Sequence, residues 1–263
     1  MAKHLTLLLA AFMLFSCGKD KKNNDEEPLT EETPVLAFTT KTYYKKTSLP
    51  CDDYCPSVSI KVPEAENVPV VADSINNKVF NTVRGIVYFG ETPYKAANYE
   101  DLMASFMGSY EELKKEFPDD VMTGFEAKIN GSVDYKTDSI INIKLNNYTF
   151  TGGAHGYEGN RSLIFDAKTG KSLKYEDIFT DVSAFRQYAE KKFREKFKIP
   201  AGKSINATGL LFEDDKFALP LNIFFKENGL LLFYNSYEIS SYAEGQKELF
   251  LPYSEIDEFL KLK

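Results

Sequence analysis

The sequence contains no tryptophan, and its 263 residues include only two histidines and three cysteines. So few histidines and cysteines leave little material for a zinc site of the usual composition. Positive charge is also in the minority, because 32 lysine and arginine residues face 39 aspartate and glutamate residues, for a net charge of −7. Nucleic-acid binding requires clustered positive charge, so this balance argues against a nucleic-acid partner and favours a basic one.

Long apolar runs are rare as well. The run at residues 5–15 follows Lys3 and His4. It is shorter than the roughly 20 residues that span a bilayer, and it has the length of a signal-peptide core. The run ends in Ser16 and Cys17, which resembles the lipobox of bacterial lipoproteins. We therefore expect cleavage before Cys17 and a lipid on its thiol; the alternative is an ordinary signal peptide with a chance cysteine.

The composition divides the chain into four parts. Residues 1–16 are expected to be the lipoprotein signal peptide, and residues 17–34 the lipidated cysteine and a flexible tether, because 18–34 contain almost no large apolar residue. Residues 35–150 and 151–263 are expected to form an N-terminal and a C-terminal α+β domain. This order predicts a lipid-anchored lipoprotein of the cell envelope, expected at the outer membrane and facing the periplasm or the surface, with the lipid as its only membrane contact.

Helices are predicted where apolar residues recur every three or four positions. The stripe of Val71, Ile75, Val79 and Val83 predicts a helix from Pro69 to about Gly90. A second helix is expected from the N-cap Asn98 to Pro118, and a third over residues 182–198.

Alternating apolar and polar residues predict strands near residues 41–44, 58–62, 125–129, 141–145, 162–166 and 248–252. Residues 221–226 and 230–234 flank an Asn228-Gly229 pair, a strong hairpin signal because both residues tolerate positive φ. The fold class expected is α+β, with two small domains made of antiparallel sheets and packed helices.

Cys51 and Cys55 are separated by three residues. In an exported protein such a pair favours a disulfide. A metal site that recruits Asp52 or Asp53 is the alternative.

The glycine-rich run at residues 149–156, TFTGGAHG, is the most unusual local feature. We take Tyr148, Gly152, Gly153, His155 and Gly156 as candidate ligand-binding residues, because glycines let a ligand approach the backbone and histidine titrates near neutral pH. A tight strand connection held by His155 is the other interpretation.

Two further groups stand out by composition. Five tyrosines are candidates for lining a sugar or protein surface, although most aromatic residues of the strands are expected in the core: Tyr43, Tyr44, Tyr234, Tyr237 and Tyr242. Acidic residues at 111, 112, 116, 119 and 120 form either a solvated helix end or a paired-carboxylate site, of which the first is favoured.

The run at 149–156 is followed by FDAKTGKSL at 165–173, LFYNSYEI at 232–239, YAEG at 242–245 and LFLPY at 249–253. Together these segments resemble a paired-domain family of exported bacterial proteins, most of them of unknown function. Its relatives include the lysozyme-binding ectodomain of anti-sigma-V factors and the N-terminal, non-catalytic region of peptidoglycan deacetylases. The resemblance spans about residues 60–260 and implies two small α+β domains, without assigning binding residues.

These observations predict a non-catalytic envelope lipoprotein that binds a basic, lysozyme-like protein or a peptidoglycan fragment. An accessory lipoprotein that docks onto another envelope protein, or a hydrolase that uses His155, are the alternatives. We expect no cofactor, no metal and no catalytic residue; the oligomeric state stays open.

Overall fold

A computed structural model describes residues 34–51, 54–118 and 124–262 of the chain. The expected signal peptide, Cys17, the tether up to residue 33 and the pair Asp52 and Asp53 lie outside these residues. Residues 34–263 form one compact unit that contains two separate hydrophobic cores. Within the described part, no helix combines the length and the apolar character that crossing a membrane requires.

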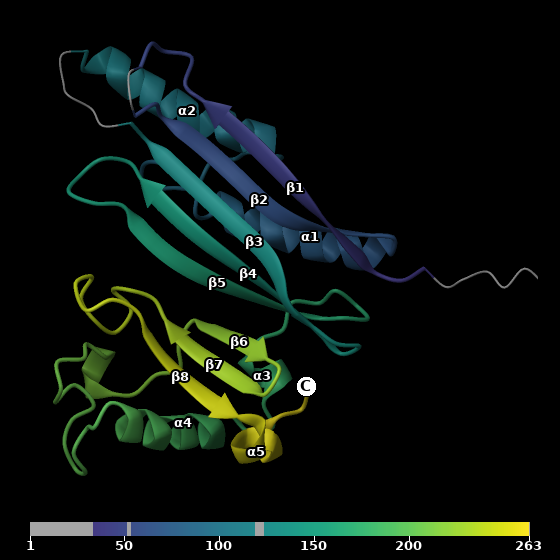
Figure 1. Cartoon of the computed structure of the whole chain (residues 1–263), viewed down its shortest axis with the longest axis vertical. Coiled ribbons are helices and arrows are strands. Elements are labelled where there is room, and N and C mark those ends of the chain that lie inside the picture. Colours follow the sequence, from purple (N-terminus) through teal and green to yellow (C-terminus); the bar gives the residue numbers. More distant parts are fainter. Residues whose placement is uncertain (1–33, 52–53, 119–123, 263) are drawn as a thin grey trace, which may run out of the picture. The chain divides into compact units, whose positions relative to one another are not determined.

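The first core is built on a five-stranded sheet in the order β1-β2-β3-β4-β5 (Figure 1). Its strands are β1 (Ala37–Lys46), β2 (Ser57–Glu66), β3 (Glu126–Lys136), β4 (Ile140–Phe150) and β5 (Tyr157–Asp166). All neighbours are antiparallel except β2 and β3, which pair in parallel. Parallel neighbours need a long crossover connection, and two helices between β2 and β3 supply it.

Helices α1 (Pro69–Arg84) and α2 (Tyr99–Glu116) cover one face of this sheet (Figure 1). The predicted stripe of α1 is buried at Val71, Ile75, Val79 and Val83. The helix ends at Arg84 rather than near Gly90, because Gly85 follows directly and glycine is a poor helix former. In α2, the Asn98 side chain accepts a hydrogen bond from the Asp101 amide, which confirms the expected N-cap.

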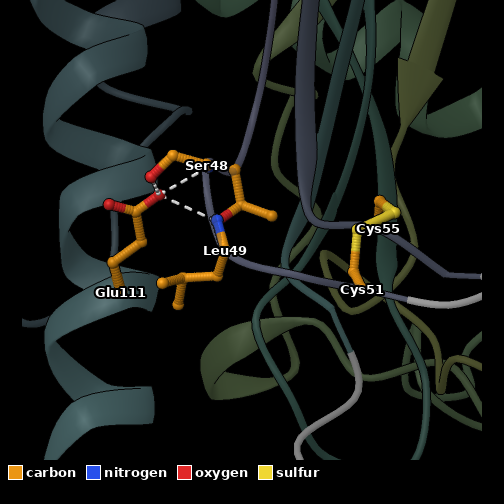
Figure 2. Close-up of a disulfide and its surroundings, with 6 residues drawn as sticks. Ser48, Leu49, Cys51, Cys55 and Glu111 are labelled. Atoms are coloured by element: carbon orange, nitrogen blue, oxygen red, sulfur yellow. Dashed lines mark hydrogen bonds between the residues drawn. A yellow bond between two sulfur atoms is a disulfide. The ribbon is translucent and has the colours of Figure 1, made fainter.

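A disulfide joins Cys51 and Cys55 in the connection between β1 and β2, which confirms the favoured interpretation of these cysteines (Figure 2). The same connection is tied to α2 by Glu111. One oxygen of its carboxylate accepts hydrogen bonds from the Thr47 hydroxyl (2.8 Å), the Ser48 amide (2.9 Å) and the Ser48 hydroxyl (3.0 Å). These bonds, first of all that from the Ser48 amide, lower the pKa of Glu111. The acidic end of α2 therefore includes a carboxylate with a structural role.

The second core lies around a three-stranded antiparallel sheet, β6-β7-β8, beside which α4 (Val182–Lys196) packs (Figure 1). Its strands are β6 (Asn222–Lys226), β7 (Gly229–Tyr234) and β8 (Lys247–Pro252). Phe185, Ala189 and Phe193 form the buried face of α4, as the sequence predicts. Four short elements complete this part: α3 (Tyr175–Ile178), η1 (Glu213–Asp215), α5 (Tyr253–Ile256) and η2 (Asp257–Phe259). The α+β class with two antiparallel-dominated sheets is thus confirmed.

The hairpin between β6 and β7 is where the sequence predicts it, but its geometry differs. Lys226 pairs with Gly229, so Glu227 and Asn228 form the turn and Gly229 belongs to β7. Neither Asn228 nor Gly229 is among the described residues with positive φ. A Cβ at position 229 would lie 2.3 Å from the carbonyl oxygen of Leu251, so the glycine is required for close strand packing.

Strand β5 was expected in the C-terminal domain, yet it pairs with β4 along its whole length. The boundary predicted near residue 150 therefore falls between two hydrogen-bonded strands. In the structure the turn at 151–156 is the loop of the β4–β5 hairpin, which agrees with the interpretation of this run as a tight strand connection.

Four buried asparagines, which we call the asparagine joint, connect the two sheets: Asn142, Asn160, Asn222 and Asn235. The Asn235 side chain accepts a hydrogen bond from the Asn160 amide (2.7 Å) and donates one to its carbonyl (3.1 Å). It thereby binds the free edge of β5 as a neighbouring strand would.

The other members of the joint act in the same way. The Asn222 side chain accepts from the Ser162 amide (2.9 Å), and the Asn142 side chain on β4 accepts from the Phe225 amide of β6 (2.9 Å). The edges of β5 and β6 are therefore satisfied by side-chain amides instead of a shared ladder.

We expect Asn235→Ala to lower the free energy of unfolding by roughly 1–3 kcal/mol, because it leaves the buried Asn160 amide without its partner and removes one of the two hydrogen bonds to the Asn160 carbonyl, which also accepts from Arg161. Urea unfolding of the chain from Gly18 to Lys263 measures the change. Asn77→Ala, on the exposed face of α1, is the control and should stay within about 0.5 kcal/mol of the wild type. Equal effects of the two substitutions would contradict the role of the joint.

Glu111→Gln should lower the stability at neutral pH, because a neutral amide oxygen is a weaker acceptor than a carboxylate. The folded-state pKa of Glu111 lies below its ordinary 4.5, so its charge-dependent stabilisation is complete above pH 4.5 and disappears as the pH falls through the folded pKa. Urea titrations at several pH values should show the difference between variant and wild type shrinking in acid. Glu112→Gln removes an exposed carboxylate of the same helix, and a similar pH profile for both variants would refute the assignment.

Candidate functional site

The glycine-rich turn at residues 151–156 connects β4 to β5. Gly152 and Gly153 have φ values of +107° and +91°, and nothing lies within 4 Å of the Cβ that a side chain would add at either position. Residues with a side chain rarely adopt such backbone conformations, so glycine is favoured at both positions. The absence of side chains also leaves the surface of the turn open. At Gly156, in contrast, a Cβ would lie 2.4 Å from the Tyr148 ring. Tyr148 therefore lies over the base of the turn.

His155 is exposed at the end of this turn, and its ring is held in two ways. Its Nδ1 atom lies 3.0 Å from the carbonyl oxygen of Gly156. Because a carbonyl only accepts, Nδ1 carries the proton and Nε2 is the free acceptor of the neutral ring. The ring also stacks on Tyr242, with centroids 4.1 Å apart and planes inclined by 12°.

A third ring continues the stack, because Tyr237 lies 5.5 Å from Tyr242 at an interplanar angle of 28°. Tyr237 and Tyr242 are 59% and 38% exposed. We call His155, Tyr237 and Tyr242 the aromatic ledge. Two of its rings come from the loop between β7 and β8, and the third comes from the β4–β5 turn. The ledge therefore exists only when the two parts of the chain are joined.

The loop that carries the two tyrosines is fixed by Glu238. The two oxygens of its carboxylate accept hydrogen bonds from the Leu221 amide (2.7 Å) and the Asn235 amide (3.0 Å). Burial raises the pKa of Glu238, while these two bonds and the nearby Arg161 act in the opposite direction. The loop thus starts at the asparagine joint, since Asn235 takes part in both arrangements.

A cavity of about 330 Å³ adjoins the ledge at Tyr242. Its other lining residues are Glu158, Ser236, Gly245 and Gln246. The cavity offers a carboxylate, a hydroxyl and an amide next to aromatic rings. Such a set suits a ligand that has one apolar face and several hydroxyl or amide groups.

The structure brings together only some of the residues that the sequence singles out. His155 meets Tyr237 and Tyr242, whereas Tyr234 is 1% exposed and belongs to the second core. Tyr43 and Tyr44 both lie on β1, where Tyr43 packs against Tyr99 at a tilt of 31° and Tyr44 is exposed. The geometry does not test whether Tyr148 or the glycines bind a ligand, so their binding role stays a prediction.

Sequence reasoning missed the groups that build the site around the rings: Glu158, Asn235, Glu238 and Gln246. One signal was available, because the run NSYE at 235–238 directly follows an apolar strand and is too polar to extend it. The described residues contain no group of three histidine, cysteine, aspartate or glutamate side chains that could hold a metal ion.

Comparisons with known proteins match two segments of the chain to two different families. Residues 50–158 match a family described as deacetylase PdaC, and residues 176–254 match a family described as a protein of unknown function, DUF3298. These matches show a paired-domain organisation. His155 lies in the first matched segment, and Tyr237 and Tyr242 lie in the second. No curated protein matches the chain.

Two crystal structures of DUF3298 proteins are similar in fold. One, from Bacteroides fragilis NCTC 9343, has a TM-score of 0.67 at 22% identity and covers 87% of this chain and 94% of its own. The other, from Pseudomonas aeruginosa PAO1, has a TM-score of 0.63 at 22% identity and covers 87% and 96%.

Tyr237 has a φ of 70°, in the left-handed region that favours glycine. We therefore expect Tyr237→Gly to be more stable than Tyr237→Ala by about 1 kcal/mol, because both remove the ring and only glycine relieves the backbone. Tyr44 is the matched control: it is 63% exposed and lies in strand β1. There the order should be reversed, with alanine more stable than glycine. Thermal or urea unfolding of the four variants decides; the same order at both sites would show that Tyr237 is not strained.

Proposed function

We propose that the protein is a non-catalytic binding module for the glycan strands of the bacterial cell wall, held on the aromatic ledge. The observation that carries this proposal is the stack of His155, Tyr242 and Tyr237 beside a polar cavity. A pyranose ring has an apolar face of C–H groups that packs on aromatic rings, and a rim of hydroxyl and amide groups that needs polar partners. The aromatic ledge offers a surface for the apolar face of the sugar, and the cavity offers polar partners for its hydroxyl and amide groups.

Two groups at this site that could transfer protons, His155 and Glu238, make contacts that hold the structure. His155 is bound to a backbone carbonyl through Nδ1 and stacked on Tyr242. Both oxygens of Glu238 accept backbone amides. A catalytic histidine is ordinarily oriented by a second polar side chain and lies beside a nucleophile. These contacts favour binding over the hydrolase alternative.

The comparisons agree with a glycan ligand. One of the two matched families is described as a deacetylase, and a deacetylase acts on acetylated substrates. The expected lipid on Cys17 and the tether that follows it would place the ledge in the cell envelope, where wall glycans carry acetamido groups. The amide groups of such sugars would then meet Glu158 and Gln246.

A basic protein such as a lysozyme is the second candidate. The net charge of −7 favours encounter with a cationic partner, and Tyr237 and Tyr242 are residues typical of protein interfaces. Glu158 and the exposed Glu244 lie close to the ledge in sequence and add negative charge there. This candidate differs from the first in its salt dependence, because charge attraction between exposed groups is screened by salt.

Isothermal titration of the chain from Gly18 to Lys263 with tetra-N-acetylchitotetraose and with muropeptides tests the proposal. We expect binding that persists at physiological salt and falls by about tenfold in Tyr242→Ala and in Tyr237→Ala, because each variant removes one stacking surface. Tyr44→Ala removes an equally exposed tyrosine from β1 and should leave the affinity unchanged.

Titration with hen lysozyme at low and at physiological salt is the second arm. Lysozyme binding that survives salt, without glycan binding, would replace the glycan by a basic protein as the ligand of the ledge. Glycan binding that is equal in the wild type and in both ring variants would refute the ledge as the site.

A further inference from the structure

A cleft in the described part of the chain lies away from the aromatic ledge, beside the C-terminal half of β5. It has a volume of about 440 Å³. Residues from α1, β5, α3 and the start of β6 line it. Its apolar lining is mainly branched and aliphatic: Leu163, Ile164, Leu173, Ile178, Leu221 and Ile223.

Two polar side chains inside this cleft, Tyr175 and Ser162, already have hydrogen-bond partners. The Tyr175 hydroxyl donates to the carbonyl of Pro220 at 2.6 Å. The Ser162 hydroxyl donates to the carbonyl of Ile223. Because these groups have partners, they offer no free donor to a ligand. The interior therefore suits a hydrocarbon rather than a sugar.

Charged side chains lie at the cleft as well. Lys78 on α1 and Lys174 before α3 contribute two ammonium groups, and Glu176 contributes one carboxylate. All three residues are exposed. Neither lysine is in an ion pair with another described residue at 4.0 Å or less, whereas the neighbouring Lys171 is paired with Asp177. The two lysines thus leave a net positive rim on a protein that is acidic overall.

Leu221 shows that the apolar surface is open to solvent. It lines the cleft and is 82% exposed, while its neighbour Ile223 is 4% exposed. An exposed leucine at the mouth of an aliphatic cleft would be covered by an apolar chain that enters from solvent. Covering this surface removes apolar area from water, which favours binding of such a chain.

From the aliphatic interior, the engaged polar groups and the two lysines, we infer that this cleft binds a free aliphatic carboxylate, with the hydrocarbon chain inside and the carboxylate at Lys78 and Lys174. This site is separate from the ledge: it shares no lining residue with the cavity at Tyr242, and its lining is mainly aliphatic where that cavity is polar. Its ligand is a fatty acid of medium chain length.

Titration of the chain from Gly18 to Lys263 with dodecanoate, below its micelle concentration, tests the inference. Both hydrophobic cores lie within residues 34–263, so this chain retains the whole compact unit. We expect saturable binding, together with chemical-shift changes at the methyl groups of Ile164 and Ile223 in NMR spectra. Dodecyltrimethylammonium, with a similar chain and the opposite charge, should bind more weakly than dodecanoate.

Two kinds of variant separate the contributions of charge and hydrocarbon. The double variant Lys78→Glu and Lys174→Glu should weaken dodecanoate binding on the order of tenfold, because it reverses the charge at the rim. Leu221→Asp should weaken dodecanoate binding as well. Because Leu221 is 82% exposed, this substitution should leave the fold intact. Lys115→Glu, an exposed lysine on α2, is the matched control for charge reversal.

Several outcomes would overturn the inference: no saturable binding of dodecanoate, equal affinity for the ammonium compound, or the same affinity in the rim variants as in Lys115→Glu. Shift changes confined to residues of the ledge would also refute it. Tyr242→Ala should leave dodecanoate binding unchanged, so failure of the cleft and failure of the glycan site are distinguishable.

Discussion

The free edge of β5 imposes the constraint on which the rest of the structure depends. An edge strand presents unpaired amide and carbonyl groups, and burying them without partners is costly. The chain satisfies these groups with side-chain amides from the C-terminal part, above all Asn235, which binds both the amide and the carbonyl of Asn160. A continuous ladder would have merged the two sheets into one. Asparagine side chains connect them while leaving two separate cores.

The position of the aromatic ledge follows from this connection. Asn235 is the first residue of the loop that carries Tyr237 and Tyr242, and Glu238 binds the Asn235 amide from within that loop. Once Asn235 is attached to β5, the two tyrosines lie beside the β4–β5 turn, and Tyr242 stacks on His155. The left-handed backbone at Tyr237 is kept because the surrounding hydrogen bonds hold the loop, as residues in unfavourable conformations commonly are at functional sites. Stability and site geometry therefore rest on the same few polar contacts.

Local sequence patterns predicted local structure well and non-local structure poorly. The stripes of α1 and α4, the Asn98 cap and the Cys51–Cys55 disulfide were predictable, because each depends on residues close together in the chain. The Asn228-Gly229 pair predicted the hairpin correctly, but not for the expected reason. Gly229 does not have a positive φ; it is needed because a Cβ there would collide with the carbonyl oxygen of Leu251. Strand β5 was expected in the C-terminal half, but it pairs with β4, because the glycine-rich turn before it does not show in sequence which strands it connects. The asparagine joint and the aromatic ledge could not be predicted from the sequence. The identity of an asparagine does not show whether it is buried or exposed in a strand, and contacts between residues 75 positions apart produce no periodic pattern.

The two surfaces differ in chemistry but share the strand that joins the sheets. Asn235 binds β5 at residue 160 and supports the ledge, and Asn222 binds it at Ser162, which itself lines the aliphatic cleft. A ligand on the ledge contacts rings from both parts of the chain, so it would bind only when the joint is formed. By linkage, any such ligand adds its binding free energy to the joined state. The same argument applies to the cleft, whose walls come from β5 on one side and β6 on the other. Occupying either site therefore stabilises the arrangement that the other one requires, even though the two sites have no lining residue in common.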